Sequence, residues 1–160
     1  GHCIPIYPRM YLWNDPAATV VSTAREANKA MPSHVVASLA QLHGALNGAK
    51  VVVLGASYRG GVKETAFSGV FPTVDALKAQ GAKVFVHDPM YSDDELKKYG
   101  FDAYHYGDAI DAAVIQADHK EYADLTSAKL PGIKTLLDGR GITKPNNWLN
   151  VKYHVIGKAK

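Results

Sequence analysis

The apolar pattern changes at Lys50, and this change restricts the possible folds more than any other feature of the sequence. Residues 51–54 form a short, mostly β-branched apolar run that ends at Gly55, which is typical of a strand buried on both faces. Beyond it the pattern predicts helices over 70–80 and 93–99, alternating with strands over 83–87, 113–116, 134–138 and 153–156. This alternation predicts an α/β fold, a Rossmann-like doubly wound parallel sheet.

A different pattern precedes the first strand. Prolines and aromatic side chains predict an irregular loop over 1–15. Asp15-Pro16 resembles a helix N-cap followed by proline at the first helical position, so a helix is predicted to begin there. We expect it to break at Met31-Pro32 and to be followed by a second helix over 35–46, which Asn47-Gly48 ends.

The length and the charge of the chain restrict its class. The 160 residues suffice for one compact domain and an appendage, and we divide them into a helical connector, residues 1–47, and an α/β domain, residues 48–160. The net charge of +3 comes from Lys and Arg scattered among Asp and Glu, so no nucleic-acid-binding stripe is predicted. The sequence has no apolar run of about 18 residues, so no membrane span is predicted.

The cysteine and histidine content limits which disulfides and metal sites the chain can form. The single cysteine, Cys3, excludes an internal disulfide and favours a reducing cytoplasm. The seven histidines lack metal-ligand spacing, so no metal site is predicted. The first residues do not resemble a signal peptide. They also lack an initiating Met and begin within what reads as a motif, so we expect a fragment of a longer chain.

Two arginines are predicted at the carboxyl edge of the sheet, where open α/β sheets bind ligands. Arg59 lies in the turn after Gly55, which matches neither G-x-G-x-x-G nor a P-loop, and Arg140 follows the strand that ends at Asp138. Each arginine either binds a phosphate or lies on a structural turn. Asp88, which ends the second strand, either meets a ribose or belongs to a turn. Two arginines at one edge indicate an anionic ligand.

Cys3 also has two interpretations. It is either a buried, inert thiol or an activated nucleophile. A stand-alone cysteine hydrolase would require a histidine base against the sulfur, and the sequence adjacency of His2 does not provide one.

Nearly the whole chain resembles the carboxyl-terminal half of the UDP-glucose/GDP-mannose dehydrogenase family. The resemblance is carried, in order, by Gly1-His2-Cys3-Ile4-Pro5, Ala27-Asn28 before Met31-Pro32, the sequence Val-Leu-Gly-Ala-Ser-Tyr-Arg at 53–59, Asp88-Pro89, Asp118-His119 and Asp138-Gly139-Arg140. Its most specific element is the cysteine motif, which reads Gly-Gly-x-Cys-x-Pro in the family. The form found here is more similar to the N-acetylhexosamine branch, such as the UDP-N-acetylmannosamine and UDP-N-acetylglucosamine 6-dehydrogenases.

The resemblance implies a cytoplasmic, NAD-dependent enzyme that oxidises the C6 alcohol of a UDP-sugar to a carboxylate for surface-polysaccharide synthesis. Cys3 would be the catalytic nucleophile, which captures the aldehyde intermediate as a thiohemiacetal. The substrate-binding residues implied by the family are Tyr11, Tyr58, Arg59 and Arg140. NAD would be held mainly by an N-terminal Rossmann domain. No cofactor-binding residue is therefore assigned here, and these residues alone are expected to be inactive.

The resemblance also implies a homodimer, because residues 1–47 match the end of the catalytic-cysteine loop and the family's central helical segment. Two departures concern catalysis. Tyr7 stands where the family commonly has an aspartate that assists water activation, and Ala66 stands where an arginine reaches NAD. Tyrosine cannot serve as a carboxylate base. The alternative is a diverged, non-catalytic module for nucleotide binding or dimerisation.

Overall fold

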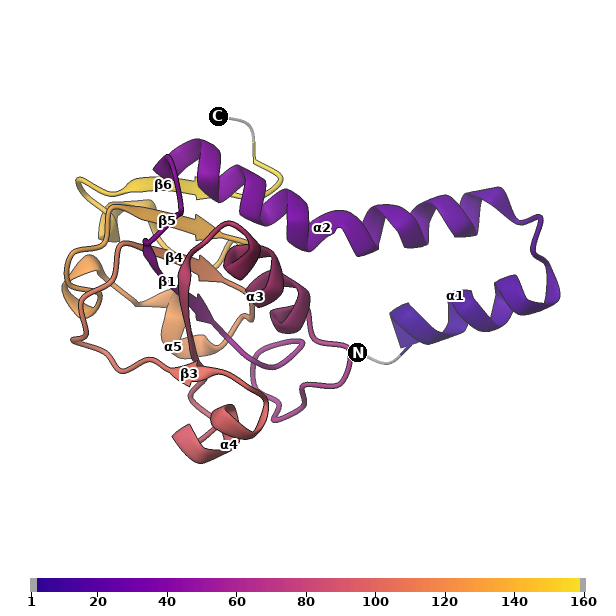
Figure 1. Ribbon diagram of the computed structural model, residues 1–160, viewed down its shortest axis with the longest axis horizontal. Helices are drawn as coiled ribbons and strands as arrows, with labels where there is room; N and C mark the ends of the chain where they lie inside the picture. The colour runs from indigo at the N-terminus through magenta and orange to yellow at the C-terminus, as the bar shows by residue number, and fades with distance from the viewer. Residues whose placement is uncertain (1–2, 159–160) are drawn as a thin grey trace.

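A parallel sheet with helices on both faces forms the body of the protein (Figure 1). The computed structural model describes residues 3–158, so His2 of the cysteine motif lies outside the described residues. Within them the sheet has six strands in the order β3-β2-β1-β4-β5-β6, and each neighbouring pair is parallel. The strands are β1 (Lys50–Leu54), β2 (Lys83–His87), β3 (Asp102–Ala103), β4 (Ala112–Ile115), β5 (Thr135–Asp138) and β6 (Lys152–Val155). This order confirms the predicted Rossmann-like fold.

The central strands are mostly apolar because both faces of the sheet are covered. The β1 side chains that follow Lys50 are fully buried and alternate between two core clusters. On one face Val51 and Val53 pack in a cluster with Leu39 and Leu77, from α2 (Thr19–His43) and α3 (Val70–Ala79). The other face packs against Tyr122 of α5 (Lys120–Ala123) and the loops around it.

The predicted strands and helices after residue 50 agree with the structure to within one or two residues. The short helix α4 (Asp93–Lys98) begins with a capping box in which Ser92 and Glu95 satisfy each other's backbone N–H groups. The sequence did not predict β3, α5 or the 3₁₀ turns η1 (Ser127–Lys129) and η2 (Pro145–Asn147). Each of these has only two to four residues, too few for a periodic pattern.

The predictions for the first 46 residues were wrong in two respects. The expected irregular loop is the helix α1 (Cys3–Asn14), although it contains Pro8. The two helices expected from Asp15 to residue 46 are the single 25-residue helix α2, which runs through Pro32. An internal proline removes one hydrogen bond and costs about 3 kcal/mol, and this cost is offset because α2 packs on α1, α3 and β5.

The two N-terminal helices have different surroundings. The second half of α2 packs on the sheet domain, where Leu39 is fully buried, and His43 Nδ1 lies 3.0 Å from Thr135 Oγ1 of β5. The first half of α2 projects away from the sheet, and α1 folds back beside it (Figure 1). Large apolar side chains remain exposed there, with Trp13 87% and Val20 82% exposed. The division of the chain at residue 47 stays a prediction.

Among residues 3–158, no helix is both long enough and apolar enough to cross a bilayer.

Candidate functional site

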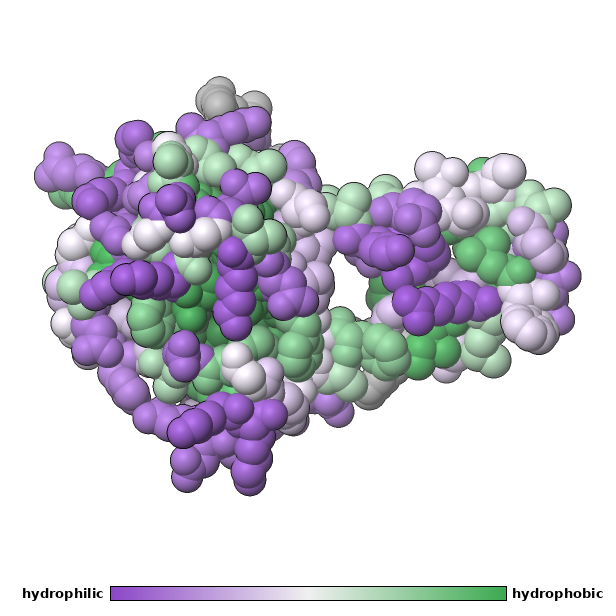
Figure 2. Space-filling model, viewed as in Figure 1, coloured by the Kyte–Doolittle hydropathy of each residue, from purple (hydrophilic) through white to green (hydrophobic). Residues whose placement is uncertain are grey.

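A cavity of about 580 Å³ lies where the carboxyl ends of β4 and β5 face the α1–α2 pair. An opening between this helical pair and the body of the domain is visible in Figure 2. The lining residues come from all of these elements and from the β1–α3 loop: Ile4, Pro5, Arg9, Arg25, Asn28, Lys29, Met31, Pro32, Val35, Tyr58, Phe67, Ser68, Gly69, Pro72, Thr73, Val114, Ile115, Gln116, Gly139 and Arg140. The position at the carboxyl edge of a parallel sheet is that of ligand sites in open α/β folds.

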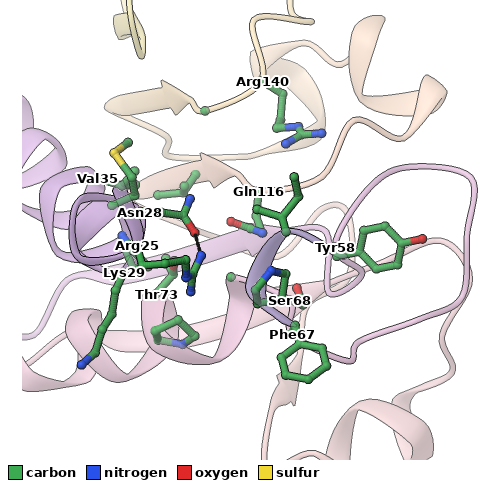
Figure 3. A pocket seen from close by; sticks show the side chains of 18 of the residues that line it. Arg25, Asn28, Lys29, Val35, Tyr58, Phe67, Ser68, Thr73, Gln116 and Arg140 are labelled. Carbon is green, nitrogen blue, oxygen red and sulfur yellow. Dashed lines mark hydrogen bonds between the residues drawn. The ribbon is translucent and has the colours of Figure 1, made fainter. Parts of the chain in front are cut away.

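The charged side chains that line the cavity are all cationic. Arg9, Arg25, Lys29 and Arg140 line it, and none of the described lining residues is Asp or Glu. Arg25 is held by a hydrogen bond of 2.8 Å from its Nη1 to Asn28 Oδ1 on the same face of α2 (Figure 3). A concave site with several cations and no carboxylate favours an anionic ligand.

Arg140 is fixed by the loop that follows β5. The buried Asp138 carboxylate accepts hydrogen bonds from the backbone N–H of Arg140 at 2.8 Å and of Gly141 at 2.7 Å. Gly139 allows this loop to approach β4, since a Cβ atom there would lie 2.7 Å from the Ile115 carbonyl oxygen. The Arg140 side chain extends from this loop and lines the cavity (Figure 3).

Asp118 joins Arg140 to the turn after β1. Its Oδ1 accepts a hydrogen bond from Arg140 Nη2 at 3.0 Å and another from the Gly60 backbone N–H at 2.8 Å. The Gly60 hydrogen bond lowers the pKa of Asp118, partial burial opposes this effect, and Arg140 adds to it. Arg140 has five N–H donors, so a single bond to Asp118 leaves the guanidinium able to bind a phosphate as well.

The turn after β1 presents Tyr58 to the cavity. Tyr58 is half-buried and lines the wall, and its backbone N–H donates to the Glu64 carbonyl at 3.1 Å. Arg59 is exposed beside it, with its guanidinium carbon 5.9 Å from the centre of the Tyr58 ring. Tyr58 therefore forms one edge of the site, and Arg59 lies next to it outside the lining.

Asp88 faces the protein interior. Its side chain is fully buried and accepts hydrogen bonds from the backbone N–H groups of Ala56, Ser57 and Met90 and from His119 Nε2. Burial raises the pKa of Asp88, but the hydrogen bonds from His119, Met90 and Ser57 outweigh it, and the pKa lies below its usual value. The structure thus gives Asp88 a role in holding the turn.

The structure brings together only part of the predicted site. Tyr58 and Arg140 line the cavity, whereas Tyr11 and Arg59 are exposed and are not among its lining residues. Cys3 is also exposed at the start of α1, so its interpretation as a buried thiol was wrong. Its neighbours Ile4 and Pro5 do line the cavity, which places Cys3 close to the cavity rim.

Sequence reasoning missed the cations that α1 and α2 contribute. Arg25 and Lys29 are four residues apart, with Asn28 between them, and this spacing places all three on one face of α2. That spacing could have indicated them, but the face of a helix that meets a ligand is known only once the fold is known. No group of three metal-ligating side chains occurs among residues 3–158.

Comparisons with known proteins identify relatives of this chain. The UDP binding domain of the UDP-glucose/GDP-mannose dehydrogenase family matches residues 52–145. The UDP-N-acetyl-D-mannosamine dehydrogenase of Methanocaldococcus jannaschii is 30% identical over 100% of this chain and 39% of its own length. That of Methanococcus vannielii is 27% identical over 97% of this chain and 38% of its own length. The chain therefore spans less than half the length of these curated relatives.

Solved structures show the same fold. The UDP-N-acetyl-mannosamine dehydrogenase of Staphylococcus aureus superposes with a TM-score of 0.72 at 27% identity, over 90% of this chain and 35% of its own. The UDP-glucose dehydrogenase of Pyrobaculum islandicum reaches a TM-score of 0.82 at 23% identity, over 99% of this chain and 38% of its own. With more than half of its residues matched by the family's UDP binding domain, the chain belongs to the UDP-glucose/GDP-mannose dehydrogenase family.

Proposed function

We propose that the cavity binds the UDP part of a nucleotide sugar, and that the protein carrying this chain oxidises the C6 alcohol of that sugar to a carboxylate. The observation that carries the proposal is the wall of four cationic side chains without a carboxylate at the carboxyl edge of β4 and β5. A diphosphate is the part of a nucleotide sugar that such a wall favours. The match to a UDP binding domain supports the same ligand.

The proposed roles follow from the position of each residue. Arg140, whose backbone is held by Asp138 and whose guanidinium bonds to Asp118, binds a phosphate, and Tyr58, with Arg59 next to it, lies on the β1 side of the nucleotide site. Tyr11 is assigned to the sugar and phosphate end only by the family resemblance. A fixed guanidinium loses little freedom when it binds.

Cys3 is the proposed nucleophile, and its thiolate adds to the carbonyl carbon of the aldehyde formed at C6. Its exposure near the cavity rim leaves the sulfur accessible to a bound substrate. The named relatives are UDP-N-acetyl-D-mannosamine dehydrogenases, so we propose an N-acetylated hexose as the sugar.

The NAD that the family implies does not fit the residues described here. The turn after β1 reads Gly-Ala-Ser-Tyr-Arg-Gly-Gly, and the Asp88 carboxylate already takes the Ala56 and Ser57 N–H groups. A dinucleotide would need such N–H groups for its pyrophosphate. We therefore propose that NAD is bound by another part of the protein.

A homodimer is proposed because large apolar side chains of α1, such as Trp13, are exposed. We also propose that the protein is cytoplasmic and acts in surface-polysaccharide synthesis. The second candidate, nucleotide binding without catalysis, is favoured by Tyr7, which is not a carboxylate and is 63% exposed.

Two assays test the proposal. Calorimetric titration with UDP, GDP and UDP-N-acetylmannosamine should show binding of the two uridine compounds and weaker binding of GDP. In the protein that carries this chain, formation of the carboxylate and of the second NADH should disappear in Cys3→Ala, while the first oxidation to the aldehyde and the affinity for UDP are retained. Unchanged NADH formation in Cys3→Ala would contradict the nucleophile assignment, and absence of NADH formation with intact UDP binding in the unaltered protein would favour the second candidate.

A further inference from the structure

The turn that follows β1 has the form of a phosphate site. Ala56 and Ser57 come directly after Gly55, whose φ is +106°. A Cβ atom at Gly55 would lie 2.4 Å from the Ala117 Cβ, so the turn is pressed against the segment after β4. In Rossmann domains that bind dinucleotides, the N–H groups of this turn face the pyrophosphate, and the acid at the end of β2 meets a ribose.

In this protein the acid at the end of β2, Asp88, binds the turn after β1 instead of facing a ribose. Asp88 Oδ2 accepts the Ala56 N–H at 2.8 Å and the Ser57 N–H at 3.1 Å. Its Oδ1 accepts the Met90 N–H at 2.9 Å. The side chain has no exposed surface, so no phosphate can reach these N–H groups while the carboxylate is there.

His119 completes the arrangement from the segment after β4. Its Nε2 lies 3.0 Å from Asp88 Oδ2, and because an ionised carboxylate only accepts, Nε2 carries the proton. The Gly61 N–H lies 3.4 Å from Nδ1. The ring is 3% exposed and meets the edge of the Tyr122 ring, so the imidazole is held by its surroundings.

We propose that Asp88 is an internal anion that occupies the phosphate position of the β1 turn, and that His119 is the positioning residue that holds it there. The turn is then closed to a ligand phosphate, and ligands are confined to the cavity on the β4 and β5 side. This role goes beyond the proposed function and does not depend on which nucleotide is bound.

Chemical rescue tests the internal anion. Asp88→Ala removes the carboxylate but keeps the Cβ, which leaves space for formate beside the N–H groups of Ala56 and Ser57. We expect Asp88→Ala to melt several degrees below the unaltered protein, and formate to raise its Tm more than chloride of equal ionic strength does. The unaltered protein should respond equally to both salts. Equal responses of the variant to formate and chloride would overturn the proposal.

A second pair of variants tests His119 and stays informative if Asp88→Ala does not fold. His119→Gln keeps a donor near the Nε2 position, whereas His119→Phe keeps the ring and its contact with Tyr122 but donates nothing. Hydrogen exchange at the backbone N–H groups of Ala56 and Ser57 should be at least tenfold faster in the Phe variant than in the Gln variant. Equal exchange in the two variants would overturn the role of His119. No nucleotide is used, so a failure of the proposed function would not affect either result.

Discussion

Replacing Gly60 by alanine should separate the turn after β1 from the segment after β4. A Cβ atom at Gly60 would lie 2.1 Å from the Asp118 carbonyl oxygen, 2.3 Å from its carbonyl carbon and 2.5 Å from the His119 nitrogen. All three are backbone atoms, so no side-chain rotation relieves the contact. Ordinary van der Waals contact begins at about 3.4 Å, and the backbone must therefore move by about 1 Å.

Two effects contribute to the expected loss of stability in Gly60→Ala. Overpacking of this kind costs about 1–3 kcal/mol. The movement also breaks the hydrogen bond from the Gly60 N–H to Asp118 Oδ1, which contributes about 1 kcal/mol. We expect Gly60→Ala to lower the free energy of unfolding by about 3 kcal/mol.

Gly61→Ala is the matched control. Its added Cβ would meet nothing within 4 Å, but its φ is +72°, a left-handed conformation that costs an alanine about 1 kcal/mol. Urea denaturation of both variants should place Gly60→Ala below Gly61→Ala by about 2 kcal/mol. Equal losses, or a larger loss in Gly61→Ala, would refute the close approach of the two backbone segments. Gly60→Ala should also weaken UDP binding, because it displaces Tyr58.

Three further perturbations test the packing and electrostatics. The pKa of Asp88 is lower in the folded protein than in the unfolded chain, where it is about 4, so the Asp88 carboxylate stabilises the fold above that pH. This stability is lost as the pH falls through the folded pKa. Asp88→Asn should therefore flatten this part of the acid denaturation curve, and an unchanged curve would contradict the pKa shift. Leu39→Ala should cost about 3 kcal/mol in urea denaturation because the side chain is fully buried, whereas Val20→Ala, 82% exposed, should cost less than about 0.5 kcal/mol. Trp13→Ser should weaken self-association in sedimentation experiments, and a monomeric unaltered protein would refute the proposed dimer.

The sheet could be predicted from the sequence because its strands are buried on both faces. Residues 51–54 are continuously apolar for that reason, and the helices between strands follow from their own spacing. By contrast, β3 consists of Asp102 and Ala103 only, and it exists because it pairs with Phe85 and Val86 of β2. Such a strand is defined by its partner, which a local pattern does not contain.

The N-terminal segment could be predicted only in part, since helix was expected over most of α2, whereas α1 and the continuity of α2 through Pro32 were not. Pro8 and Pro32 are helix breakers in sequence terms, yet both lie inside helices. The candidate site shows the same limit. Arg140 was found because a glycine-flanked turn follows a strand, but Arg25 reaches the cavity only because the first half of α2 projects beyond the carboxyl edge of the sheet (Figure 1).

The affinity of the protein for UDP compared with uridine tests the central claim most directly. Arg140→Ala should weaken UDP binding about tenfold to hundredfold, which corresponds to the roughly 1.5–3 kcal/mol of a hydrogen bond to a charged group, and should leave uridine binding unchanged. Lys83→Ala is the control, because it removes the same charge at the amino end of β2, away from the cavity. The account predicts unaltered UDP affinity in that control. Equal UDP affinity in Arg140→Ala and the unaltered protein would contradict a phosphate site at the edge of β4 and β5.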